Sequence, residues 1–185
     1  MHRKYTLAVC AAALTCACIA GERAAAEVLN VAANGFEVRE IAHTAASPDQ
    51  VYAALLQPAR WWSSDHTFSR SAANLVLDAR AGGCWCETLP NGGSVEHLTV
   101  VFVSPGKVLR MRGALGPLQA LAVDGAMTWS IQSAAGGTDI SLTYSVGGYV
   151  KDGFDDLSKA VDHVLGEQLT RLKKLVAGEP APRAQ

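Results

Sequence analysis

An amphipathic helix near the end of the chain constrains the fold more than any other feature. Over residues 154–176, apolar side chains recur with the 3.6-residue period of one helical face. Acidic residues open this segment and basic residues close it, the order that a helix dipole favours, and Gly178 and Pro180 then end the helix. The apolar face consists of Leu157, Val161, Val164, Leu165, Leu169, Leu172 and Val176. So long an apolar face requires a partner surface of similar length.

The sequence before this helix is mostly strand-like, so the predicted partner is a sheet. Residues 36–45 predict a first strand, Ser47-Pro48 begins a short helix that runs to about residue 57, and a second helical turn follows at 59–62. Further strands are predicted at 75–80, 84–89, 94–103, 108–112, 126–132 and 138–146. The last of these alternates apolar and polar residues, which is typical of an antiparallel sheet with one face in water. The predicted fold is therefore α+β: a strongly curved antiparallel sheet of about six to seven strands wrapped around the C-terminal helix, with two short helices after the first strand.

The first 26 residues have the pattern of a secretory signal peptide. Residues 1–4 are basic, residues 5–20 are apolar, and residues 24–26 are all alanine, which predicts cleavage after Ala26 and a periplasmic or secreted protein. The apolar run is shorter than the roughly 20 residues of a membrane span. A lipoprotein leader is a less favoured alternative. Cys10, which follows Leu7-Ala8-Val9, comes too early in the leader, and Cys16 and Cys18 lack the expected large aliphatic residue three positions earlier.

Residues 27–178 are predicted to form a single domain, followed by a disordered tail at 179–185. The whole chain has 16 basic and 17 acidic residues and a formal net charge of −1, without a basic patch, so nucleic acid is not an expected partner. The exported domain would keep only Cys84 and Cys86 of the five cysteines, so it is not a disulfide scaffold. No phosphate loop, dinucleotide fingerprint or nucleophile elbow is present, and no cofactor is expected.

Several short motifs, taken in order, resemble the START-like helix-grip superfamily, also called SRPBCC. They are the opening Ser47-Pro48-Asp49-Gln50-Val51-Tyr52, then Trp61-Trp62, Gly82-Gly83, Thr128-Trp129 and Gly147-Gly148. Within the superfamily, the chain is most similar to the bacterial branch described as activator-of-Hsp90-ATPase-like or polyketide cyclase-like. The resemblance covers residues 36–176, nearly the whole mature chain.

The resemblance implies a cavity between the sheet and the closing helix. Members of the superfamily bind hydrophobic molecules such as lipids, sterols or polyketides there, and a few catalyse cyclisation or hydration. A chaperone partner is not expected for an exported chain. Aromatic and neighbouring side chains are the predicted ligand-binding residues, although such residues often only fill a core. They are Trp61, Trp62, His66, Phe68, Trp129, Tyr144 and Leu165.

A predicted hairpin brings together the side chains that could carry chemistry. If Asn91-Gly92 is the centre of a two-residue turn, Cys86 lies opposite His97. Cys84, Cys86 and His97 then share a face and form a weak candidate for a metal or thiol-sensor site. A disulfide between the two cysteines is disfavoured, because side chains two apart on a regular strand are roughly 6–7 Å apart. Two free thiols packed as apolar groups are the favoured interpretation.

The same pairing places Glu87 opposite Glu96, with His97 beside them. Two facing carboxyl groups and an imidazole are candidates for general acid–base catalysis, provided that they are buried. The alternative is that both glutamates are exposed or paired with arginines of the next strand. The sequence thus favours an exported protein that binds a small hydrophobic or amphipathic molecule. An acid–base enzyme of cyclase or hydratase type, using Glu87, Glu96 and His97, is the alternative.

Overall fold

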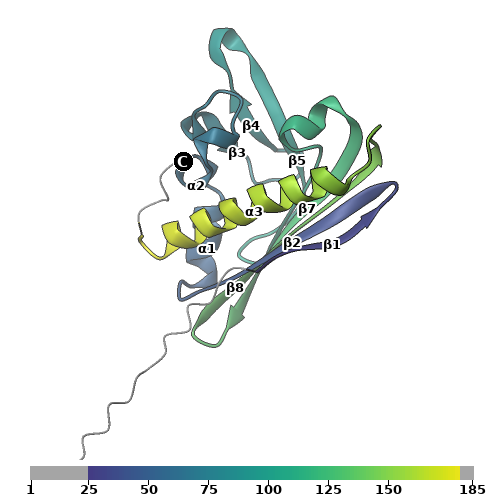
Figure 1. Ribbon diagram of the computed structural model, residues 1–185. Helices are drawn as coiled ribbons and strands as arrows, with labels where there is room; N and C mark the ends of the chain where they lie inside the picture. Colours follow the sequence, from purple (N-terminus) through teal and green to yellow (C-terminus); the bar gives the residue numbers. More distant parts are fainter. Residues whose placement is uncertain (1–24, 180–185) are drawn as a thin grey trace, which may run out of the picture.

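A single antiparallel sheet of eight strands forms the body of the protein (Figure 1). The structure is a computed structural model and describes residues 25–179; most of the predicted leader and most of the predicted tail lie outside this range. The strand order across the sheet is β1-β2-β8-β7-β6-β5-β4-β3. The strands are β1 (Ala25–Ala32), β2 (Gly35–Thr44), β3 (Leu75–Leu77), β4 (Cys84–Thr88), β5 (Ser94–Ser104), β6 (Val108–Arg112), β7 (Ala122–Ala134) and β8 (Gly137–Tyr149).

Three α-helices pack on one side of this sheet. The longest, α3 (Asp155–Val176), lies across the sheet, and the short helices α1 (Pro48–Leu55) and α2 (Pro58–Trp61) pack against it (Figure 1). Helix α1 begins where the sequence predicted, because Ser47 and Gln50 form a reciprocal capping box. The helix-grip fold predicted from the sequence is therefore confirmed.

The core lies between α3 and the inner face of the sheet. The predicted alternation of β8 is confirmed, since Ile140, Leu142 and Tyr144 are fully buried while the intervening polar residues face outward. From the helix, Leu165 and Leu169 are completely buried against this face. The strand repeats its side-chain direction every 2 residues and the helix every 3.6 residues. The apolar face of each thus contributes to one buried layer.

The sheet has one strand more than the six to seven predicted. Strand β1, for which the sequence analysis predicted no element, pairs antiparallel with β2 and places Val28 opposite Val38. It escaped prediction because it is an edge strand with a register shift between Val28 and Asn30, which interrupts the alternation of side chains. Between β6 and β7, where the sequence analysis predicted no element, lies a 3₁₀ helix, η4 (Gly116–Ala120).

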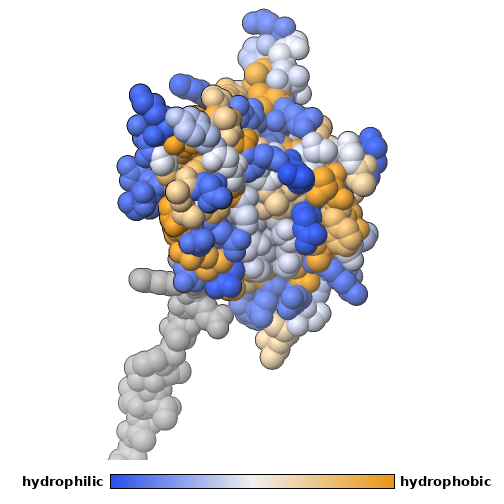
Figure 2. Space-filling view, turned by 90° about the vertical axis from the view of Figure 1, so that its right-hand side faces the viewer, coloured by the Kyte–Doolittle hydropathy of each residue, from blue (hydrophilic) through white to orange (hydrophobic). Residues whose placement is uncertain are grey.

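Apolar side chains on the surface are scattered. The most exposed large ones are Tyr149, Val76 and Phe68, which come from different parts of the fold. On the face shown in Figure 2, hydrophobic and hydrophilic residues are interspersed, so no continuous apolar surface covers it. Within residues 25–179, no helix is both long and apolar enough to cross a membrane.

Candidate functional site

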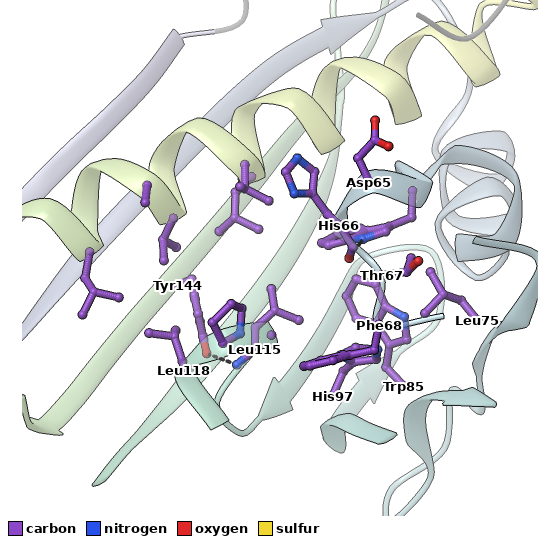
Figure 3. Close-up of a pocket in the computed structure, with 18 residues that line it drawn as sticks. Asp65, His66, Thr67, Phe68, Leu75, Trp85, His97, Leu115, Leu118 and Tyr144 are labelled. Atoms are coloured by element: carbon purple, nitrogen blue, oxygen red, sulfur yellow. Dashed lines mark hydrogen bonds between the residues drawn. The ribbon is translucent and has the colours of Figure 1, made fainter. Parts of the chain in front are cut away.

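A largely apolar cavity lies between α3 and the sheet (Figure 3). Its volume is about 380 Å³. One wall is the N-terminal half of α3, which contributes Leu157, Ala160, Val161, Val164 and Leu165. Facing this wall are Tyr144 and the segment 115–118, while Phe68, Trp85 and His97 gather at the other end of the cavity (Figure 3). The apolar face of α3 therefore has two functions: its C-terminal half closes the core, and its N-terminal half lines the cavity.

Five of the seven predicted ligand-binding residues line this cavity: Trp62, His66, Phe68, Tyr144 and Leu165. The other two, Trp61 and Trp129, lie in the core instead. Their rings contact each other edge to face with centroids 5.7 Å apart, and both side chains are almost completely buried. The sequence could not separate the two groups, because aromatic residues serve core and cavity equally well in this fold.

Helix α3 fixes the loop that carries Trp62, His66 and Phe68. The backbone N–H of Ser63 donates a hydrogen bond to Oε1 of Gln168 at 2.8 Å, and Nε of Arg171 donates to the carbonyl oxygen of Trp61 at 2.9 Å. Gln168 is completely buried, so breaking its bond with Ser63 would leave the Gln168 oxygen without a hydrogen-bond partner and without access to water. Two hydrogen bonds therefore join α3 to the start of this loop.

Tyr144 positions the opposite wall. Its hydroxyl donates to the carbonyl oxygen of Gly113 at 2.8 Å and accepts from the N–H of Leu115 at 3.0 Å. Burial raises the pKa of Tyr144 to about 12, so this hydroxyl stays protonated at neutral pH. Both hydrogen-bonding roles are used, which makes Tyr144 a support for the segment 113–118 and only an apolar contact for a ligand.

The sequence analysis missed several of the lining residues, above all Leu115 and Leu118. They come from the stretch between β6 and β7, for which the sequence analysis predicted no element, and their apolar character was the available signal. Nothing local to this stretch indicates that a buried tyrosine 30 residues later holds it against the cavity.

Glu87 and His97 form a buried pair at the cavity end near Phe68. Nε2 of His97 lies 3.0 Å from Oε2 of Glu87, and the two side chains are 5% and 0% exposed. Glu87 also accepts hydrogen bonds from the backbone N–H groups of Phe68 and Ser69. The ring of Phe68 stacks on that of His97 with centroids 6.0 Å apart. Glu87 thus connects the loop of Phe68 to strands β4 and β5.

The pKa values of the pair favour an ionised glutamate and a neutral histidine. Burial alone would raise the pKa of Glu87, but hydrogen bonds from Ser69, Phe68 and His97 together outweigh it and lower the pKa below its usual value. Burial lowers the pKa of His97, and the hydrogen bond with Glu87 only partly opposes this effect. An ionised carboxylate accepts hydrogen bonds only, so the proton of neutral His97 lies on Nε2 and the lone pair on Nδ1.

The predicted register of the β4–β5 hairpin is wrong near its turn. The turn is a three-residue 3₁₀ segment, Pro90–Gly92, so Glu87 pairs with Val95 and Cys86 with Glu96. A β-bulge at His97 then restores the pairing of Trp85 with Leu98. As the extra residue of the bulge, His97 points inward beside Glu87, whereas Glu96 is exposed on the outer face. The predicted catalytic trio is thereby reduced to Glu87 and His97.

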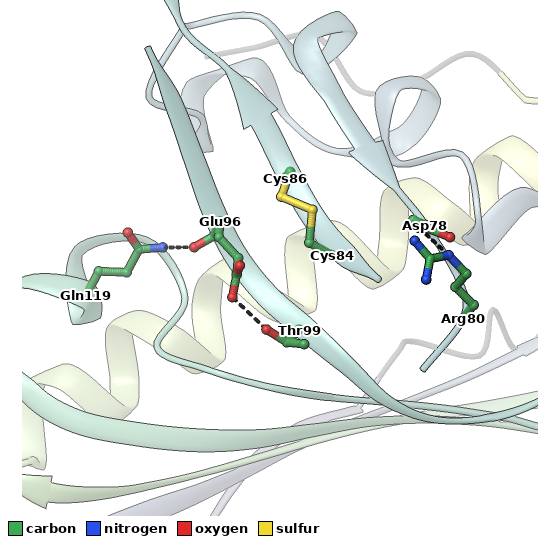
Figure 4. Close-up of a disulfide and its surroundings, with 7 residues drawn as sticks. All are labelled: Asp78, Arg80, Cys84, Cys86, Glu96, Thr99 and Gln119. Atoms are coloured by element: carbon green, nitrogen blue, oxygen red, sulfur yellow. Dashed lines mark hydrogen bonds and ion pairs between the residues drawn. A yellow bond between two sulfur atoms is a disulfide. The ribbon is translucent and has the colours of Figure 1, made fainter. Parts of the chain in front are cut away.

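Cys84 and Cys86 form a disulfide, which corrects the expectation of two free thiols (Figure 4). Their Cα atoms are 5.5 Å apart, closer than in a regular strand and within disulfide reach. The distortion accompanies the register shift between Trp85 and Cys86. The disulfide lies on the face of β4 opposite to Trp85 and Glu87, beside Glu96 and Thr99 (Figure 4).

The weak metal or thiol-sensor candidate is not assembled. The thiols of Cys84 and Cys86 are consumed by their disulfide on the outer face, while His97 lies on the inner face. Among residues 25–179, no group of three or more His, Cys, Asp or Glu side chains is arranged to hold a metal ion.

The sequence of residues 36–177 matches the profile of a family described as polyketide cyclase/dehydrase and lipid transport. The chain belongs to this polyketide cyclase/dehydrase and lipid transport family. The match spans most of the protein, from β2 to the end of α3. Membership confirms the START-like, polyketide cyclase-like resemblance seen in the motifs. No curated protein matches the sequence.

Solved structures of the same fold agree with this membership. Protein MLL2253 from Mesorhizobium loti has a TM-score of 0.58 at 16% identity, covering 78% of this chain and 98% of its own. An uncharacterised protein from Rhizobium leguminosarum has a TM-score of 0.58 at 19% identity, covering 85% of this chain and 100% of its own. CalU16 from Micromonospora echinospora has a TM-score of 0.56 at 16% identity, covering 86% of each chain. At these identities the likeness establishes the fold alone.

Proposed function

We propose that this family member binds a small hydrophobic or amphipathic molecule in the cavity between α3 and the sheet. The observation that carries the proposal is the cavity itself, about 380 Å³ and lined mainly by apolar side chains. Ligand sites of small molecules are typically concave, largely apolar and roughly 300–1,000 Å³ in volume. The lipid transport named in the family description supports the same function.

The distribution of polar groups favours an amphipathic ligand. The α3 wall is formed by Leu157, Val161, Val164 and their neighbours, without a charged side chain facing the cavity. Polar side chains are concentrated on the loop 65–67 and at His97. A ligand with an apolar body and one polar end would satisfy both regions.

Blocking the cavity tests this proposal. Ala160 lines the cavity and is exposed, so an Ala160→Trp variant should fold and fill the space that a ligand needs. The matched control is Lys159→Trp, the neighbouring position on α3 with a side chain 72% exposed and outside the cavity lining. We expect the fluorescent probe N-phenyl-1-naphthylamine to bind the wild type and the control equally, and the Ala160→Trp variant at least about 10-fold more weakly. Equal binding by all three proteins, with unchanged melting temperatures, would contradict the proposal.

We further propose that the domain of residues 27–178 acts outside the cytoplasm. The basic, apolar and small-residue segments of residues 1–26 support export, and Cys84–Cys86 is a bond typical of oxidising compartments. A cytoplasmic chaperone partner does not fit this location.

An acid–base enzyme is the second candidate, supported by one observation. Neutral His97, held by ionised Glu87 at the cavity end, has the arrangement of a general base. Glu96 has no part in it, because its side chain is exposed on the outer face. The enzyme would be favoured over the carrier if the wild type converts a bound compound and the His97→Phe variant still binds that compound but no longer converts it.

A further inference from the structure

Two buried polar atoms, each from a residue that lines the cavity, have no hydrogen-bond partner among the described residues. They are Nε1 of Trp85, a donor, and Nδ1 of His97, an acceptor. Both residues line the same end of the cavity, and their rings lie with centroids 6.2 Å apart. A buried polar atom without a partner is unfavourable, and native structures seldom keep one without a reason.

Three neighbouring polar side chains of the lining already have partners. The indole N–H of Trp62 donates to the carbonyl oxygen of His66 at 2.9 Å, and His66 itself contacts Glu167 at 3.0 Å. The Thr67 hydroxyl donates to the carbonyl oxygen of Ser64 at 2.8 Å. Trp85 and His97 therefore differ from these three residues, because one offers an unused donor and the other an unused acceptor on neighbouring rings.

We propose that the ligand carries a neutral hydroxyl group that binds between Trp85 and His97, accepting from the indole N–H and donating to Nδ1. A hydroxyl is the smallest ligand group that can both accept and donate a hydrogen bond. This inference rests on the proposed ligand-binding function and adds the chemical class, an apolar alcohol or phenol. The inference requires the side chain of Phe68, which stacks on His97 and is 52% exposed, to move aside when the hydroxyl enters.

An anionic ligand fits this end poorly. A carboxylate has no proton to donate to the lone pair of His97, and it would lie close to the buried negative charge of Glu87. A purely apolar end would leave both the Trp85 and His97 atoms unsatisfied. The site should therefore select a ligand with a hydroxyl group over a carboxylate or a purely apolar group, because only the hydroxyl supplies a hydrogen to Nδ1 of His97.

The test compares three ligands with the same naphthalene body: 2-naphthol, 2-methylnaphthalene and 2-naphthoate, each displacing N-phenyl-1-naphthylamine. We expect the wild type to bind 2-naphthol about 10-fold more tightly than 2-methylnaphthalene, since each net hydrogen bond contributes about 3- to 10-fold. We expect 2-naphthoate to bind weakest. A wild type that binds 2-methylnaphthalene or 2-naphthoate most tightly would overturn the inference, whereas failure of all three ligands and of the probe to bind would overturn the proposed function itself.

Two variants and a control assign the effect to these atoms. Trp85→Phe removes the donor, and the double variant Glu87→Gln/His97→Phe removes the acceptor together with the buried charge that would otherwise lose its partner. Both should abolish the preference for 2-naphthol over 2-methylnaphthalene. Trp62→Phe, whose indole N–H is already bonded, alters the wall but should leave the ratio of the two affinities unchanged. A preference that persists in both test variants would contradict the inference.

Discussion

The carboxyl group of Glu40 on β2 faces that of Asp162 on α3 inside the protein. Glu40 is completely buried, and its oxygens have no hydrogen-bond donor among the described residues. Burial, and then the charge and hydrogen bond of Asp162, raise the pKa of Glu40 from 4.5 to about 8. At neutral pH Glu40 is therefore protonated, and its uncharged carboxyl group lies buried between the sheet and α3.

Because of Glu40, alkaline pH should lower the stability of the folded protein. Unfolded Glu40 loses its proton near pH 4.5 and folded Glu40 near pH 8, so the unfolded state binds fewer protons between these values. The free energy of unfolding should therefore fall as pH rises through this window. Glu40→Gln, whose side chain is uncharged at every pH, should flatten the dependence and stabilise the protein by about 1–3 kcal/mol at pH 8. Urea unfolding from pH 5 to 9 measures this, with Asp156→Asn, a fully exposed α3 position, as the control.

Removing the charge of Glu87 should destabilise the protein at neutral pH. Glu87→Gln replaces an ionised acceptor of three hydrogen bonds, including that of His97, and we expect a loss of about 2–4 kcal/mol in the free energy of unfolding. Because the folded pKa of Glu87 is lowered, its contribution is present above the unfolded pKa and disappears as pH falls through the folded value. Glu96→Gln on the outer face should change stability by less than about 0.5 kcal/mol. A similar effect of both substitutions in urea unfolding would contradict the assigned burial of Glu87.

Reduction of the disulfide should have little effect on the cavity. Cys84–Cys86 closes a very short loop, for which chain entropy predicts a stabilisation of only about 1–2 kcal/mol. Its face of β4 is opposite to that of Trp85. We expect the Cys84→Ser/Cys86→Ser variant to melt a few degrees lower and to bind N-phenyl-1-naphthylamine with unchanged affinity. A marked loss of binding would show that the bulge at His97 depends on the disulfide.

Export should remove the first 26 residues. When the full chain is expressed in a bacterium with a periplasm, we expect the recovered protein to begin at Glu27, as measured by intact mass. A chain recovered from the cytoplasm with residues 1–26 retained would contradict both the cleavage and the location.

The sequence by itself determined the fold class and most of its elements. The periods of β8 and α3 are local properties of the chain, and the signals that begin α1 at Ser47 are confirmed by its capping box. Local patterns also predicted that Cys84 and Cys86 share one face of β4, because side chains alternate along a strand.

Only the tertiary structure decided the chemistry of the site. A three-residue turn and one bulge moved His97 to the inner face, excluded Glu96, and brought Cys84 and Cys86 within disulfide reach. Such register shifts depend on how two strands pack as a pair, and a shift of one residue reverses the face of a side chain. The unused atoms of Trp85 and His97 likewise exist only because distant segments enclose them. Periodicity can therefore predict the layers of this protein, whereas the polar end of its cavity follows from their packing.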